Sequence, residues 1–267
     1  MRMVPVPIER SSAGDPARTL ELLWRVPADA PRRGPRQRLS VDAIVAVATG
    51  LADAEGLDAV TMRRVAERLG VAPMTPYTYV PGKAELLDLM LDAAYAGMRR
   101  ADTSGQPWRA RLTAVAEENR SLFERHSWVA TISTSRPPLG PGMMAKYEHE
   151  LSALEGLGLD DVEMDAALTY LLTFVQANAR SAAEARAARQ ASAMDEEQWW
   201  AANAPLLERV LDPERYPTAA RVGTSAGTAH GAAYSPGHAY AFGLSRVLDG
   251  LAVLIAGRDE RNGTEPR

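Results

Sequence analysis

Arginine, threonine and tyrosine side chains crowd into one stretch of this chain, from Thr61 to Lys83, which reads TMRRVAERLGVAPMTPYTYVPGK. A guanidinium carries a two-pronged set of donors that matches a guanine edge or a phosphate, and hydroxyl groups bind phosphate oxygens. A helix that served only a hydrophobic core would carry few such groups. The stretch therefore favours contact with a nucleic acid duplex over burial in a core.

Two short helices joined at Gly70 are expected to position these groups. Thr61 is a suitable N-cap for the first helix, which turns Val65 and Leu69 inward and a mostly cationic face outward. Pro73 suits the first position of the second helix, which we expect to end at about Tyr79. The helix–turn–helix motif has this geometry and places its second helix in the major groove. The alternative is a pair of core helices, which leaves unexplained the polar side chains Thr75, Tyr77, Thr78 and Tyr79.

A supporting helix precedes this motif, because Ile44, Val47, Ala48 and Leu51 recur at helical spacing between a possible N-cap at Ser40 and a stop at Gly56. The dipeptide Pro81-Gly82 separates the motif from a long helix that is expected to run from Lys83 to about Arg100. No strand alternation occurs along the chain. The expected fold is all-α, with an N-terminal three-helix DNA-binding domain joined by a long helix to a C-terminal helical bundle.

The rest of the chain continues the helical pattern. An apolar stripe after the linker 102–107 comprises Leu112, Val115, Ala116, Asn119, Leu122 and Phe123. Further helices are expected near 127–133, at 141–156 and at 160–191, and the apolar character of 166–179 predicts that this part is buried on all sides. Residues 217–234 are rich in Ala, Gly, Thr and Ser and are predicted to form a mobile loop. A final helix after Pro236 has a wide apolar face that includes Leu244, Val247, Leu248, Leu251, Leu254 and Ile255.

The predicted division is a flexible N-terminal arm at 1–38, a helix-turn-helix domain at 39–84 and a helical ligand-binding and dimerisation domain at 85–260. Within the arm, residues 20–26 could dock as a short helix against the body. The arm ends in four arginines, which either follow phosphates or a minor groove or form a solvated tail: Arg32, Arg33, Arg36 and Arg38.

Composition excludes several classes of protein. The chain of 267 residues has no cysteine and four histidines, which excludes disulfide and thiolate chemistry and disfavours a metal site. The net charge is −4, yet residues 31–83 hold eight basic and five acidic residues, so positive charge is concentrated where DNA contact is expected. No uninterrupted apolar run approaches the roughly 18 residues that span a bilayer, and no signal peptide is evident, so we expect a cytoplasmic protein without membrane contact.

Residues 39–98 resemble the N-terminal domain of the TetR family of transcriptional repressors. The resemblance lies in ADAEGLDAVTMRRVAERLGV, Tyr77, Tyr79, Val80 and Lys83. The segments SRPPLGPG and AFGLSRVLDGLAVLIAG are similar, more loosely, to the ligand-binding domain of the tetracycline-repressor branch of that family. The resemblance implies a ligand-responsive regulator, most simply a repressor that a small molecule releases from a palindromic operator.

The resemblance also implies roles for individual residues. Arg63 would read a base edge and Arg64 would neutralise a phosphate. Pro73, Met74 and Thr75 would face the bases at the front of the recognition helix. Contacts to the sugar–phosphate backbone would come from Thr61, Tyr77, Tyr79 and Lys83, with Thr78 beside them. Two residues depart from the family pattern: Ala72 replaces a helix cap, and Pro76 replaces an apolar residue, which predicts a lost core contact and a helix that orders fully on DNA.

A pocket for the small molecule is expected in the C-terminal domain, where aromatic walls and polar tips are supplied by Asn119, Phe123, His126, Trp128, Tyr147, Tyr170, Phe174 and Asn178. Aromatic residues at helical spacing are equally consistent with plain core. Magnesium–tetracycline is disfavoured, because no histidine lies between 83 and 100. No cofactor or metal is expected. The apolar faces of 166–179 and of the last helix predict a homodimer and hence a palindromic double-stranded DNA operator.

Three other functions compete with that of a repressor released by a small molecule. An enzyme would require a converging set of catalytic groups, and His149 with Glu148 and Glu150 does not provide it, because adjacent residues on a helix diverge. A DNA-binding dimer without a small-molecule ligand, and a transcriptional activator in place of a repressor, remain open on the sequence alone.

Overall fold

The computed structural model describes residues 11–26, 39–132, 136–192 and 194–262. All regular secondary structure in these ranges is helical. The DNA-binding half contains α1 (Pro16–Leu23), α2 (Val41–Glu55), η1 (Leu57–Ala59), α3 (Met62–Leu69), η2 (Pro76–Thr78) and α4 (Lys83–Ala96). The C-terminal half contains α5 (Trp108–Arg125), η3 (Ser127–Ala130), α6 (Pro141–Ser152), α7 (Asp161–Ser192), α8 (Glu196–Val210), α9 (Pro217–His230) and α10 (Pro236–Asn262).

Helix α4 is the structural centre of the molecule. It packs against α1, α2 and α6. Most of its side chains are buried, including Leu86, Leu87 and Met90. It ends at Ala96, four residues before the end expected from the sequence, where the backbone N–H of Gly97 donates to the carbonyl of Ala93. Helix α4 is therefore shared by the two halves of the molecule.

Helices α2 and α3 begin at the N-cap residues that the sequence predicts. The Ser40 hydroxyl accepts from the N–H of Ala43 at 3.1 Å and starts α2. The Thr61 hydroxyl accepts from the N–H of Arg64 at 3.2 Å and starts α3. Gly70 ends α3 in the left-handed conformation, with φ of 67°, which costs glycine nothing and other residues about 1 kcal/mol. The sequence prediction of α2, α3 and the turn between α3 and η2 is confirmed.

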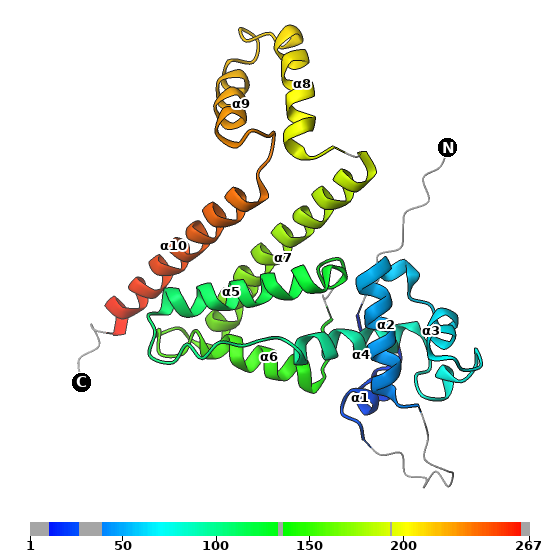
Figure 1. The fold of residues 1–267 in the computed structure, drawn as a ribbon. Coiled ribbons are helices and arrows are strands. Elements are labelled where there is room, and N and C mark those ends of the chain that lie inside the picture. The colour runs from blue at the N-terminus through cyan, green and yellow to red at the C-terminus, as the bar shows by residue number, and fades with distance from the viewer. Residues whose placement is uncertain (1–10, 27–38, 133–135, 193, 263–267) are drawn as a thin grey trace, which may run out of the picture.

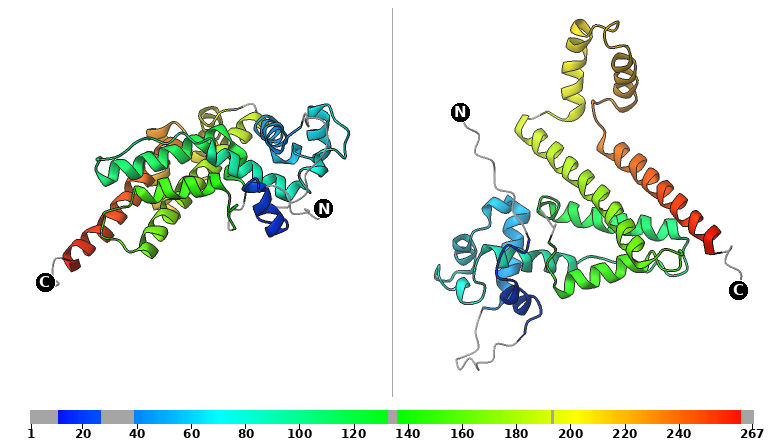
Figure 2. Two further views of the ribbon diagram at one scale, coloured as in Figure 1. Left: turned by 90° about the horizontal axis from the view of Figure 1, so that it is seen from below. Right: turned by 180° about the vertical axis from the view of Figure 1, so that it is seen from behind.

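The C-terminal half is assembled from helices that lie far apart in the chain. Helix α7 packs against α5 and α10 (Figure 1). The predicted stripe of α5 is buried in full, from Leu112 to Phe123. Helices α8 and α9 form a hairpin beyond the ends of α7 and α10, away from the other helices (Figure 1 and the right view of Figure 2).

Two sequence expectations for this half are wrong. Residues 166–179 are not buried on all sides, because α5 and α10 cover only one face of α7 and leave the Tyr170 side chain 56% exposed. Residues 217–234 are not a loop throughout but contain α9, with Pro217 in its first turn and Gly231 in the left-handed conformation at its end. Alanine is the strongest helix former, and this proline–glycine pairing marks a helix, so composition alone misled the prediction.

Among the described residues one segment, Pro236–Arg258 of α10, is long and apolar enough by length and composition to cross a membrane. The segment is apolar on average but is not an uninterrupted apolar run, since Arg246 and Asp249 lie within it. The segment also packs on α7, and it carries Asp249 in ion pairs with Arg109 at 2.5 Å and Arg246 at 2.7 Å. These contacts are typical of a helix at a protein interface, although only 33% of the apolar window is buried in the single chain.

Candidate functional site

The outward face of α3 is presented to solvent as the sequence predicts. Met62, Val65 and Ala66 anchor the helix in the core. The Arg63 side chain is 81% exposed and its Nε donates to Glu67 Oε1 at 3.0 Å. An exposed pair of this kind is worth about 0–1 kcal/mol, so Arg63 is free to exchange Glu67 for another acceptor.

The segment after Gly70 differs from the expected second helix. It contains a turn at residues 73–75 followed by the 3-10 helix η2, with bonds from Thr78 N to Thr75 O at 3.1 Å and from Tyr79 N to Pro76 O at 3.0 Å. An α-helix would use bonds to the fourth preceding residue, but Pro76 has no N–H to donate to Ala72. The recognition segment of the ligand-free chain is therefore a tight turn with little regular helix.

Pro76 itself corrects a second expectation. Its side chain is buried, so the ring fills the position at which the sequence predicted a lost core contact. Val80 is likewise fully buried and holds the end of the segment. Proline is apolar and rigid, so it supplies packing at this position while it removes one backbone bond.

The side chains that the sequence assigned to DNA contact project outward from this segment. Met74 is 70% exposed and Tyr77 is 43% exposed. Pro73 and Thr78 are also exposed, while Thr75 is half-buried. Tyr79 is half-buried and packs against the core. Neither tyrosine is sealed in the interior. Helix α3, which carries the exposed Arg63, lies at one end of the molecule (Figure 1).

Two further cations of the predicted DNA surface have partners within the protein. Both terminal oxygens of Glu55, at the end of α2, lie 2.8 Å from Arg64 Nη2, and Arg68 Nη2 lies 3.3 Å from the same carboxylate. Lys83 opens α4, and its Nζ lies 3.5 Å from the carbonyl of Leu57. In this state Arg64 therefore joins α2 to α3.

A cavity of about 160 Å³ lies between α5, α7 and α10. Of the eight residues predicted to bind a ligand, Phe123 and Asn178 line it. Phe174 stacks on the lining residue Tyr240 with 5.8 Å between ring centroids. The sequence analysis missed Tyr240 and two arginines of the lining, Arg120 and Arg186. Tyr240 lies at the start of an apolar helix, and no local pattern indicates that it faces α5.

Arg120 and Tyr240 give this cavity its polar character. The Arg120 guanidinium lies 4.9 Å from the centroid of the Tyr240 ring, a cation–π arrangement. Arg120 also pairs with Glu117 and Glu124 on its own helix. Burial raises the pKa of the Tyr240 phenol, so the hydroxyl stays protonated at neutral pH. The cavity thus combines an aromatic wall with a cation that can change partners.

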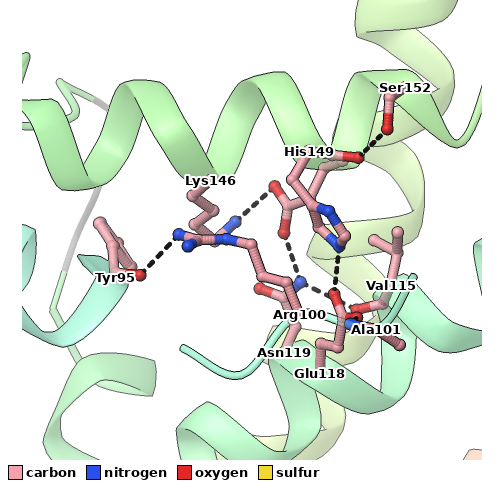
Figure 3. A network of polar contacts seen from close by, with 10 residues as sticks. Tyr95, Arg100, Ala101, Val115, Glu118, Asn119, Lys146, His149 and Ser152 are labelled. Carbon is pink, nitrogen blue, oxygen red and sulfur yellow. Dashed lines mark hydrogen bonds and ion pairs between the residues drawn. The ribbon is translucent and has the colours of Figure 1, made fainter. Parts of the chain in front are cut away.

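Asn119 belongs to a different site, a buried polar network between α5 and α6 (Figure 3). Its amide donates to Glu150 Oε1 at 2.5 Å and to the carbonyl of Val115 at 3.0 Å. Glu150 Oε2 also lies 2.6 Å from Lys146 Nζ, and the Lys146 ammonium lies 5.6 Å from the ring centroid of Tyr95. The Lys146 and Glu150 side chains are only 7% and 1% exposed. Buried charges of this kind persist only when they are paired and hydrogen-bonded.

The neighbouring His149 contacts a different residue of α5 from the one that Glu150 binds. Its Nε2 lies 2.8 Å from Glu118 Oε2 (Figure 3). Glu118 Oε1 in turn accepts from the N–H of Ala101 at 2.7 Å. His149 and Glu150 therefore serve separate contacts, and Glu148 is exposed. No group of three or more potential ligands that could hold a metal ion occurs in the described ranges.

The remaining four predicted ligand residues do not converge on the cavity. His126 Nδ1 and Trp128 Nε1 lie 2.8 Å and 2.7 Å from Asp53 Oδ1 of α2, so these two residues link η3 to the DNA-binding half. The Tyr147 hydroxyl donates to Asp165 at 2.7 Å. Tyr170 lies on the uncovered face of α7.

Comparison with known proteins gives matches over both halves. Residues 44–90 match the model of "Bacterial regulatory proteins, tetR family", and residues 102–255 match that of "Tetracyclin repressor-like, C-terminal domain". The chain is 41% identical to the HTH-type transcriptional repressor DrrR1 of Streptomyces coeruleorubidus over 252 residues, which cover 94% of this chain and 90% of that protein.

Solved structures of the TetR family protein ActR from Streptomyces coelicolor have a similar fold. ActR in complex with actinorhodin aligns with a TM-score of 0.68 and 28% identity, over 80% of this chain and 96% of ActR. ActR in complex with (S)-DNPA aligns with a TM-score of 0.65 and 27% identity, over 81% of this chain and 98% of ActR.

Proposed function

The chain belongs to the TetR family of bacterial transcriptional regulators, and we propose that it represses transcription as a homodimer on a palindromic operator, from which a small molecule releases it. The observation that carries this proposal is the exposed surface of Arg63, Met74 and Tyr77, which is joined through one buried helix, α4, to a half that contains a cavity. The family consists of regulators and not of enzymes.

On the DNA side, we assign base contact to Arg63 and to Pro73, Met74 and Thr75 at the front of the recognition segment. Arg63 has the exposure and the donor geometry for a guanine edge. Thr61, Tyr77, Thr78, Tyr79 and Lys83 would hold the sugar–phosphate backbone. Arg64 would reach a phosphate only by leaving Glu55, so its contribution to DNA affinity would be smaller than that of an unpaired arginine.

The turn at 73–79 has a consequence for DNA binding. Because only a few local bonds hold η2 in the ligand-free chain, we propose that the segment becomes a more regular helix when it enters the major groove. Amide exchange would detect this as stronger protection of residues 77–80 in the DNA complex. Equal protection of α3 and of residues 77–80 in the free protein would exclude it.

The homodimer is supported by the faces of α7 and α10 that no part of the single chain covers. Phe242 and Val253 on α10 and Tyr170 on α7 are more than half exposed. Apolar patches of this kind in a regulator mark an interface. A two-fold pair of recognition segments reads two half-sites about one helical turn, or roughly 34 Å, apart. DNA lies in the cytoplasm of bacteria, which is the location that we propose for this protein.

For the effector, we propose binding in the C-terminal half, with the cavity of Phe123, Asn178 and Tyr240 as its site. ActR, which has a similar fold, has been solved with two different small molecules. A ligand that binds one arrangement of α5, α7 and α10 better than another shifts the population of both states, and α4 carries the change to the DNA-binding half. A DNA-binding dimer without an effector remains the alternative.

The test is selection of bound duplexes from a random pool, followed by a screen for compounds that release the selected duplex. Replacement of Arg63 by alanine should relax preference at one base pair and cost about 1–3 kcal/mol of binding free energy. Replacement of Lys83 should weaken binding to all sequences alike. Arg209→Ala, at an exposed position on α8, is the matched control. It should change neither the base preference nor the overall affinity for DNA.

The assignment of base reader and backbone anchor fails if the Arg63 and Lys83 variants lose affinity uniformly across sequences. A selection that returns no preferred sequence would contradict the operator proposal itself. If the operator is found but no compound releases it, the dimer without an effector becomes the better description.

A further inference from the structure

Residues Ser11–Arg25, which we call the N-terminal strap, run along α4 and contact both halves of the molecule. The strap contains α1, whose Leu22 and Leu23 side chains are buried in the core. Helix α1 packs against α4 (Figures 1 and 2). The sequence predicted that residues 20–26 could dock as a short helix against the body. A docked helix is confirmed, but it spans Pro16–Leu23 and ends three residues earlier than expected. Arg32, Arg33, Arg36 and Arg38 lie outside the described residues.

Three bonds tie the strap to residues 136–139, which lead into α6 of the C-terminal half. The hydroxyl of Ser11 donates to the carbonyl of Arg136 at 2.6 Å. The hydroxyl of Ser12 lies 3.3 Å from the carbonyl of Pro137. The indole Nε1 of Trp24 donates to the carbonyl of Leu139 at 2.8 Å. These bonds come from both ends of the strap, so they fix its whole length to the C-terminal half.

Two further bonds tie the strap to α4. The N–H of Ser12 donates to Asp88 Oδ1 at 2.8 Å, and the N–H of Asp15 donates to Glu85 Oε1 at 3.3 Å. Gly14 lies so close to the Glu85 carboxylate that any side chain at this position would collide with it. One turn further along α4, Asp92 Oδ1 accepts from the N–H of Met143 in α6 at 2.8 Å. The acidic side of α4 is thus covered by the strap and by the start of α6.

At its end the strap also reaches the DNA-binding half, where Arg25 Nη2 lies 2.5 Å from Asp42 Oδ1 in the first turn of α2. Ser12 and Arg25 are the two non-glycine residues with positive φ in the described chain, at 53° and 52°. A backbone conformation of this kind is unfavourable for residues with a side chain and persists where surrounding contacts impose it. Both ends of the strap are therefore held by their contacts and not by local preference.

We propose that the N-terminal strap restrains the movement of α4 relative to the C-terminal half and so holds the recognition segments in the spacing that the operator requires. The restraint of α4 does not depend on the proposed function, whereas the effect on the spacing of the recognition segments does. Any displacement of α4 against residues 136–143 must break either the bonds from the strap to α4 or the bonds from the strap to residues 136–139. An effector that moves α4 therefore works against the strap, and a weaker strap widens the range of spacings.

The test compares two substitutions at one position. Ser12→Pro removes the N–H that Asp88 accepts and cannot adopt a φ of 53°, whereas Ser12→Gly keeps the N–H and accepts that φ without cost. Both variants lose the hydroxyl contact to Pro137, so the comparison isolates the N–H and the φ of residue 12. Amide exchange in the free protein should be about tenfold faster in α4 and in 139–143 for the proline variant and less than about twofold faster for the glycine variant. Helix α7 should exchange equally in all three proteins.

Trp24→Phe provides a second variant in case proline at position 12 disturbs folding. It keeps an aromatic ring and removes the N–H that Leu139 accepts. The same acceleration, about threefold, is expected in 139–143. If neither Ser12→Pro nor Trp24→Phe changes exchange in these regions, the strap is not a restraint and the proposal is wrong.

The affinity for the selected duplex tests the second part. The proline variant should bind it about fivefold more weakly, with base preference unchanged, because the spacing and not the contacts has been altered. Faster exchange with unchanged affinity would overturn the link to spacing. The exchange experiment requires no operator, so a failure of the proposed function and a failure of the strap proposal give different results.

Discussion

The DNA-facing surface at residues 61–80 and the network around Lys146 and Glu150 use the same kinds of polar side chain in opposite surroundings. Arg63 and Glu67 form their pair on one exposed turn of α3, with the Arg63 side chain 81% exposed. Lys146 and Glu150 have the same spacing of four residues on α6, but they are almost fully buried, and Glu150 also accepts from the amide of Asn119 on α5. The comparison shows that spacing along a helix predicts a pair, whereas its energetic role depends on what covers it.

The two regions also differ in how they are assembled. The DNA-facing surface comes from about twenty consecutive residues, and its caps are local. The cavity and the buried network join α5 to α6, α7 and α10, which lie tens of residues to more than a hundred apart in the chain. A substitution at the DNA-facing surface should therefore change binding with little effect on folding, and a substitution in the interior should do the reverse.

The largest effect is expected for Glu150→Ala. The substitution leaves the buried Lys146 ammonium without its carboxylate and should lower the free energy of unfolding by about 3–5 kcal/mol. Urea unfolding measures it. The matched substitution Glu67→Ala leaves Arg63 in water and should change stability by less than about 0.5 kcal/mol. Equal losses in the two variants would remove the contrast between the regions.

A smaller loss is expected where the interior is crowded. A methyl group at Gly142 would collide with the backbone carbonyl of Asp92 in α4, so Gly142→Ala should cost about 1–3 kcal/mol in a thermal melt. Gly50→Ala is the control in the DNA-binding half. Nothing lies within 4 Å of the added carbon there, and alanine favours the middle of α2, so a gain of about 0.5–1 kcal/mol is expected.

Asp88 provides a pH-dependent test of the interior. Burial, with a smaller contribution from the charge of Glu85, raises the pKa of this carboxyl from 3.8 to about 6, against the opposing bond from Ser12 N–H. Because the pKa is higher in the folded chain than in the unfolded chain, the protonated Asp88 carboxyl contributes its full stability to the fold below about pH 4. This contribution to the free energy of unfolding is lost as the pH rises through about 6. In Asp88→Asn the side chain does not titrate, so this pH-dependent loss of stability is absent. Its carbonyl oxygen can still accept from the N–H of Ser12.

The expected result is that the stability of Asp88→Asn relative to the native chain increases by about 1–2 kcal/mol between pH 4 and pH 8, after allowance for solvent screening. Urea unfolding at several pH values measures the difference. Glu208→Gln, at an exposed position on α8, is the control. A difference that does not change with pH would show that Asp88 is ionised as easily in the folded as in the unfolded chain.

The smallest effect concerns DNA affinity. Glu67→Ala frees Arg63 from its partner and removes a negative charge beside the expected phosphates, so binding of the selected duplex should tighten about two- to fivefold. Fluorescence anisotropy at low salt measures the change, which should shrink as salt is raised. An unchanged affinity would indicate that Arg63 does not exchange Glu67 for DNA.

Much of the DNA-binding half could be predicted because its signals are local. Ser40, Thr61 and Gly70 act within three or four residues, and the predicted boundaries of α2 and α3 are confirmed. The prediction for residues 73–79 was wrong in kind, since a helix was expected where a turn and η2 occur. The sequence predicted a lost core contact at Pro76, but the ring is buried, because its burial depends on the core that surrounds it.

The C-terminal half was less predictable. The stripe of α5 from Leu112 to Phe123 follows from periodicity, and it is buried as expected. The candidate ligand residues share a chemistry but not a location. Asn119 belongs to the buried network, and His126 and Trp128 contact Asp53. Phe123 and Asn178 line the cavity. Local sequence does not state which distant helix a side chain will meet.

The amino-acid sequence by itself determined the helical class, the caps and turn of the helix-turn-helix motif, and the outward placement of Arg63, Met74 and Tyr77, because backbone capping and side-chain periodicity act over one or two turns. Tertiary structure alone decided that α4 would be shared by both halves, that Lys146 and Glu150 would be buried together, and that Ser11–Arg25 would lie across the joint. These outcomes depend on contacts between segments tens to more than a hundred residues apart, and only the packing of the whole chain selects them.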